Sequence, residues 1–61
     1  MNVPIREQIA CIERELRYRH RAYPRFVEHG RMTISKAREE IRRMEAVLET
    51  LKKIEEWQRL I

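Results

Sequence analysis

The feature that most constrains the fold is a heptad repeat in the second half of the chain. Between residues 34 and 51, apolar side chains recur at alternating steps of three and four, and the sequence has no proline or glycine from there to residue 61. This spacing keeps side chains on one stripe of an α-helix and packs that stripe against another helix. The pattern predicts a helix over about residues 34–60 and an all-α protein. The stripe consists of Ile34, Ala37, Ile41, Met44, Leu48 and Leu51.

A shorter stripe of the same kind lies near the start of the chain. Its members follow one another at steps of four, three and four, and are Ile5, Ile9, Ile12 and Leu16. Pro4 falls where the first turn of a helix tolerates proline, with Asn2 or Val3 as the N-cap. Pro24 disfavours helical geometry at Tyr23 before it. The first helix is therefore predicted over about residues 4–22.

The segment between the two helices, residues 23–33, carries the signals of a structured elbow. Pro24 can begin a short helical turn that stops at Gly30, the only glycine and hence the natural left-handed residue after a helix. Thr33 is the expected N-cap of the second helix, with Ser35 as its competitor. Two helices joined by a short elbow fold back on each other. We expect one antiparallel helical-hairpin domain over residues 1–61.

A hairpin of 61 residues has too small a core to be stable alone, so it needs a further source of stability. Cys11 is the only cysteine and excludes an internal disulfide, and with His20 and His29 it provides too few ligands for structural zinc. Assembly of hairpins into a helical-bundle homo-oligomer is the remaining expectation.

The expected surface for this assembly lies at the end of the second helix. The predicted helix lengths leave about nine C-terminal residues without a partner in the first helix. In the same region an apolar stripe that begins at Val47 turns away from the heptad stripe. An unpartnered helix end with exposed apolar side chains predicts an interface. Its residues are Ile54, Trp57, Leu60 and Ile61.

The charge of the chain points to a second surface. The net charge is +4, and the whole excess lies between residues 17 and 31, which hold five arginines and one glutamate. One guanidinium group can bind two phosphate oxygens at once, and aromatic rings interleaved with the arginines can stack on bases. The predicted phosphate ligands are Arg17, Arg19, Arg21, Arg25 and Arg31, and the predicted stacking residues are Tyr18, Tyr23 and Phe26.

Simpler interpretations of the same residues stay open. Glu13 with Arg17, and Glu15 with Arg19, have the spacing of ordinary ion pairs on a solvated helix face. Tyr23 and Phe26 can instead close the end of the hairpin core.

Composition disfavours an enzyme. The sequence has no aspartate, and the hairpin places no histidine beside its serine or threonines. A hairpin also offers little concave interior in which to perturb a pKa. We therefore predict a non-enzymatic protein with no catalytic residues, no metal and no cofactor. The longest apolar run, residues 9–12, is too short for a membrane span, so a cytoplasmic protein without membrane contact is expected.

One local pattern resembles a known family. Tyr23-Pro24-Arg25 followed by Gly30-Arg31-Met32, together with Ala37, Glu40, Ile41, Met44 and Glu45, is similar to a family of small uncharacterised proteins of bacteriophages and prophages. The resemblance covers residues 9–51. It implies a phage protein in the host cytoplasm, with a role such as counter-defence against the host.

These observations lead to one leading hypothesis and two alternatives. The leading hypothesis is an oligomer of hairpins whose basic-aromatic elbow binds or sequesters a phosphate-bearing nucleotide. The first alternative is a DNA- or RNA-binding accessory protein that uses the same residues. The second is an interaction module or inhibitor that docks on a host protein through the C-terminal apolar residues.

Overall fold

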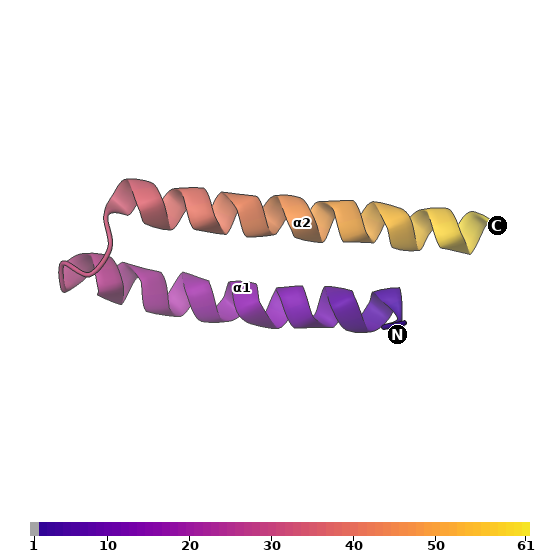
Figure 1. The fold of residues 1–61 in the computed structure, drawn as a ribbon, viewed down its shortest axis with the longest axis horizontal. Coiled ribbons are helices and arrows are strands. Elements are labelled where there is room, and N and C mark those ends of the chain that lie inside the picture. Colours follow the sequence, from indigo (N-terminus) through magenta and orange to yellow (C-terminus); the bar gives the residue numbers. More distant parts are fainter. Residues whose placement is uncertain (1) are drawn as a thin grey trace.

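The computed structural model describes residues 2–61 as two long helices folded back on each other (Figure 1). Helix α1 spans Ile5–Glu28 and helix α2 spans Ile34–Leu60. They run antiparallel in an elongated molecule of 48 × 18 × 18 Å. The predicted all-α helical hairpin is confirmed. Neither of these helices has an apolar stretch long enough to cross a membrane.

Helix α1 is longer than the sequence pattern predicts, because it continues through Tyr23 and Pro24 to Glu28. The predicted end near Ala22 is wrong. Pro24 has no N–H to donate to the carbonyl of His20, so one helical hydrogen bond is lost. Packing compensates for this loss, since Ala22 is buried and Tyr23 and Val27 are half-buried. As a result, α1 and α2 differ in length by only three residues, fewer than the difference of about nine that the sequence predicts. The C-terminal end of α2 still extends beyond the start of α1 (Figure 1).

The start of α1 also differs in detail from the prediction. Pro4 itself is the N-cap, with φ −55° and ψ 145°, and it makes no side-chain capping hydrogen bond. Instead of a cap from Asn2 or Val3, the Gln8 side chain reaches back, and its Nε2 donates to the carbonyl of Val3 at 2.8 Å. A side chain of the helix itself, Gln8, thus stabilises the start of α1.

The turn between the helices follows the sequence signals. Gly30 has φ +73°, and its N–H donates to the carbonyl of Val27 at 3.1 Å. The N–H of Arg31 donates to the carbonyl of Phe26 at 2.8 Å. These two bonds make a Schellman motif with glycine in its left-handed position. The predicted role of Gly30 as the helix-ending residue is confirmed.

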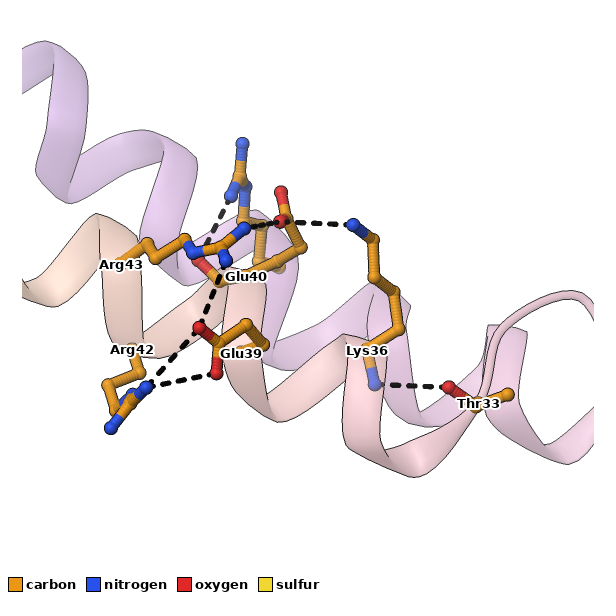
Figure 2. Close-up of polar contacts among 7 residues, drawn as sticks. Thr33, Lys36, Glu39, Glu40, Arg42 and Arg43 are labelled. Carbon is orange, nitrogen blue, oxygen red and sulfur yellow. Dashed lines mark hydrogen bonds and ion pairs between the residues drawn. The ribbon is translucent and has the colours of Figure 1, made fainter.

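Helix α2 begins with a side-chain cap. Thr33 Oγ1 accepts a hydrogen bond from the N–H of Lys36 at 3.0 Å, so Thr33, and not Ser35, is the N-cap (Figure 2). This bond satisfies one of the free N–H groups at the start of the helix. The predicted cap at Thr33 is confirmed.

The core along the hairpin seam is thin. Among residues 2–61 only four side chains are buried, and they are Ile9, Leu16, Ala22 and Ala37. Most other members of the two predicted stripes are half-buried. Ile34 is an exception, because it is 54% exposed in the first turn of α2, where α1 has reached its end. Its predicted place in the core is wrong.

The two long edges of the hairpin have different chemistry. On one edge, the ion-paired edge, Arg6 contacts Glu55 at 2.6 Å and Lys52 contacts Glu13 at 3.8 Å. Further along the same edge His20 Nε2 lies 3.8 Å from Glu45. The opposite edge has no cross-helix ion pair within residues 2–61. Toward the chain ends this edge is lined by Cys11, Ile12, Val47 and Leu51, and we call that part the apolar edge. Nearer the turn, Arg19 joins the helices through its hydrogen bond to the carbonyl of Glu40.

Candidate functional site

The predicted phosphate ligands divide according to the helix face on which they lie. Arg19 belongs to the hairpin seam, with a side chain only 18% exposed. Its Nε donates to Glu15 at 3.0 Å and its Nη1 donates to the carbonyl of Glu40 at 3.3 Å. Its guanidinium also lies 5.7 Å from the centre of the Tyr23 ring. Arg19 therefore joins α1 to α2, and we leave it out of the candidate site.

The remaining arginines of α1 lie on its outer face. Arg17, Arg21 and Arg25 are exposed, and Arg14 precedes them at the same helical spacing. Steps of three and four place these four side chains on one stripe of the helix, which we call the arginine stripe. Within residues 2–61, none of the four makes an ion pair with a carboxylate. The stripe thus presents uncompensated positive charge to solvent.

Helix α2 shows the opposite arrangement, because its basic residues face acidic neighbours (Figure 2). Arg42 and Arg43 contact Glu39 at 3.0 and 3.1 Å. Arg43 and Lys36 both contact Glu40, at 3.2 and 3.4 Å. In the described part of α2, Arg38 is the one basic side chain without such a partner. Most of the free positive charge of the hairpin therefore lies on α1 and in the turn.

A cross-helix contact explains why Arg17 is free. The spacing of Glu13 and Arg17 predicts an ion pair along α1, but Glu13 contacts Lys52 of α2 instead. Glu15, by contrast, does pair with Arg19 as its spacing predicts. Packing of the second helix thus takes one carboxylate away from the stripe and leaves Arg17 exposed.

The turn holds a second group of predicted site residues. Arg25, Phe26, His29 and Arg31 line a shallow cleft of about 500 Å³. The cleft lies where the arginine stripe ends, because Arg25 belongs to both. Positive charge therefore continues from the outer face of α1 around the end of the hairpin.

The three predicted stacking residues occupy different environments. Tyr18 is 49% exposed and lies on the outer part of α1, within one helical turn of Arg14 and Arg21. Tyr23 is half-buried, between Arg19 and Phe26, with its ring centre 6.0 Å from that of Phe26. Phe26 is half-buried at the cleft. Tyr18 is therefore the aromatic ring best placed to stack on a ligand.

The predicted interface residues near the C-terminus are all exposed. Their exposed fractions are 40% for Ile54, 65% for Trp57, 78% for Leu60 and 88% for Ile61. At 100° per residue, Ile54 and Ile61 lie within about 40° of Val47, whereas Trp57 is rotated by about 80° and Leu60 by about 140° toward the outer face of α2. The exposed apolar residues of α2 therefore begin on the side of the apolar edge, at Val47 and Ile54, and Leu60 does not lie on that side.

Sequence reasoning missed Arg14. The signal was present, because Arg14 stands three residues before Arg17 and so belongs to the same helical stripe. Arg14 lies outside residues 17–31, the segment of excess positive charge on which the prediction was based. No group of three or more histidine, cysteine or acidic side chains suited to a metal ion occurs in residues 2–61.

Comparisons with known proteins give no relatives. No protein-family model, no curated protein and no solved structure matches the chain. The resemblance to the phage family stays a prediction, and the case for a function depends on the geometry of the hairpin.

Proposed function

We propose that this protein binds nucleic acid along its phosphate backbone, with the arginine stripe as the contact surface. The observation that carries the proposal is the stripe itself, which presents four exposed arginines without carboxylate partners on one face of α1. From Arg14 to Arg25 it extends roughly 16 Å along the helix. Duplex DNA carries one negative charge per about 1.7 Å of its axis, so a stripe of this length lies along several phosphates.

The shape of the stripe favours a polymer over a single nucleotide. The arginines are spread along the convex outer face of a helix, and one small ligand cannot reach all of them at once. Phosphate contacts fix the position of a protein on nucleic acid without reading its sequence. Tyr18 can add stacking on an unpaired base, which is tolerant of base type. The proposed activity is therefore binding with little sequence preference.

The salt dependence of binding tests this proposal. Neutralising four phosphates gives a slope of log K against log salt of about −3.6 on duplex DNA and about −2.8 on a single strand. We expect Arg17→Ala, Arg21→Ala and Arg25→Ala each to reduce that slope by about one, across unrelated sequences. Fluorescence anisotropy over a salt series measures it.

Two arginine variants serve as controls. Arg42→Ala removes the same charge from the other helix, where Arg42 is paired with Glu39, and should leave the slope unchanged. Arg19→Ala should lower stability without changing the slope, since Arg19 is held in the seam. An equal loss of affinity in all five variants would mean that net charge alone drives binding, which contradicts a defined stripe.

A second candidate, binding of a nucleotide-sized ligand, is supported by the cleft at the turn. Its size lies within the range of small-molecule sites, about 300–1,000 Å³, and Arg25, Arg31 and Phe26 supply the predicted ligand chemistry. Arg31 separates the two candidates because it lies in the cleft and off the stripe. Calorimetry with mono-, di- and cyclic nucleotides should show binding that Arg31→Ala abolishes if the cleft is the site.

The wider role stays a prediction. A helical-bundle oligomer, a counter-defence role in the host cytoplasm and the absence of catalysis are compatible with this proposal, whereas docking of a host protein through the C-terminal residues remains an alternative to it. The resemblance to phage proteins motivates the counter-defence role.

A further inference from the structure

The apolar edge of the hairpin contains a groove that the proposed nucleic-acid contacts do not use. It encloses about 480 Å³, and its lining residues are Val3, Glu7, Gln8, Cys11, Ile12, Val47 and Leu51. Val3 and Val47 are 51% and 45% exposed. Ile54 lies two turns after Val47 on the same side of α2 and extends the apolar surface, and the exposed Trp57 lies one turn further on, rotated toward the outer face of α2. Exposed apolar side chains grouped in this way mark an interaction site.

The total surface area of the hairpin indicates how much of it a partner should cover. The accessible surface is 5261 Å² for a chain of 7.6 kDa. A compact monomer of that mass exposes about 4,300 Å². The excess of about 1,000 Å² is close to what one partner contributes to a standard protein interface, about 800 Å². One interface of ordinary size would therefore bring the chain to the surface area of a stable folded protein.

The chemistry of the groove fits a second copy of the same chain. Glu7 is the only side chain with a formal charge in its lining, so two copies of this surface meet with little repulsion. Depletion of charge is typical of the core of an interface between proteins. The ion-paired edge is unsuited to this contact, because Arg6, Glu13 and Glu45 already have partners across the hairpin.

We propose that the apolar edge is the contact surface of an isologous homodimer, in which two hairpins form a four-helix bundle. The same patch on both copies faces itself, as a two-fold axis requires. Val47 and Ile54 are its apolar anchors, Trp57 lies at its margin, and Cys11 becomes covered. On α1 the groove extends only to Ile12, and Arg17, Arg21 and Arg25 lie beyond it toward the turn, so they stay outside the contact. This inference is independent of the proposed nucleic-acid binding.

Sedimentation equilibrium of the full chain tests the dimer directly. We expect the wild-type protein to sediment at twice 7.6 kDa at high concentration. Val47→Glu introduces a charge into the patch at a helical position that tolerates glutamate, and should weaken dimerisation by roughly tenfold or more. Ile34→Glu is the matched control, because Ile34 is comparably exposed but lies at the start of α2, outside the patch.

A second measurement does not depend on a variant folding. Alkylation of the Cys11 thiol should slow as wild-type concentration rises, since dimerisation covers it. A wild-type protein that sediments as a monomer, or a Cys11 reactivity independent of concentration, overturns the proposal. So does a dimer that Ile34→Glu disrupts and Val47→Glu does not, because the contact would then lie at the turn end of the hairpin.

Discussion

At the scale of single residues, position on the helix determines what each arginine does. Arg19 and Arg21 are two residues apart, yet Arg19 makes three contacts within the hairpin and Arg21 points into solvent. The difference follows from 100° per residue, which turns Arg21 most of the way to the far side of the helix. Composition groups the arginines of residues 17–31 together. The helix divides them into a structural residue and a binding surface.

Gly30 gives a prediction at the same scale. A Cβ added at Gly30 meets no atom within 4 Å, so the cost of substitution comes from its backbone angle of φ +73° alone. We expect Gly30→Ala to lower the free energy of unfolding by about 1 kcal/mol. Gly30→Asn should cost less, because asparagine tolerates the left-handed region better than alanine. Urea denaturation followed by circular dichroism measures both, and equal stability of the alanine variant and wild type would contradict this account.

At the scale of elements, the continuation of α1 through Pro24 is the main difference between prediction and structure. The local preference of Tyr23 before a proline favours a helix end, and the sequence alone contains no opposing signal. The opposing term comes from the half-buried packing of Tyr23 and Val27 against α2, which requires knowing where α2 lies. By contrast, the helix end at Gly30 and the cap at Thr33 depend on local chemistry and were predictable.

The candidate site, like the helix ends, was predictable where local sequence determines it and not where contacts between the helices do. The charge excess places a basic surface between residues 17 and 31, and the exposed arginines of α1 and the turn lie there. Which arginine stays free could not be predicted, because Glu13 pairs with Lys52 across the hairpin and not with Arg17 along the helix. Local spacing rules describe one helix and cannot anticipate a competing partner on another.

Pro24 also yields a prediction for α1 as an element. Pro24→Ala restores an N–H that can donate to the carbonyl of His20, and should raise the free energy of unfolding by about 1–3 kcal/mol. Pro4→Ala is the matched control, because the first N–H groups of a helix have no intrahelical acceptor and little should change. A loss of stability in Pro24→Ala would show that contacts of the proline ring beside Val27 and Ile34 outweigh the missing hydrogen bond.

At the scale of the whole molecule, the four side chains that are buried among residues 2–61 have to stabilise the chain. Each ordered residue costs roughly 1.5 kcal/mol of conformational entropy, and small domains usually need a further source of stability. In this hairpin the apolar edge supplies apolar surface that remains exposed. The heptad pattern of both helices is typical of a helical bundle. Folding and association are therefore expected to be coupled.

This coupling predicts that the melting temperature depends on protein concentration. If the dimer is the stable form, a tenfold increase in concentration adds about 1.4 kcal/mol to its stability and raises Tm by roughly a few degrees. Val47→Glu should melt at a lower temperature than the wild type at each concentration, whereas Arg21→Ala should follow the wild type because Arg21 lies beyond the groove. Differential scanning calorimetry over a concentration series makes the comparison. A Tm that is constant for the wild type would mean that the seam between α1 and α2 suffices for stability, and that the exposed apolar edge serves another purpose.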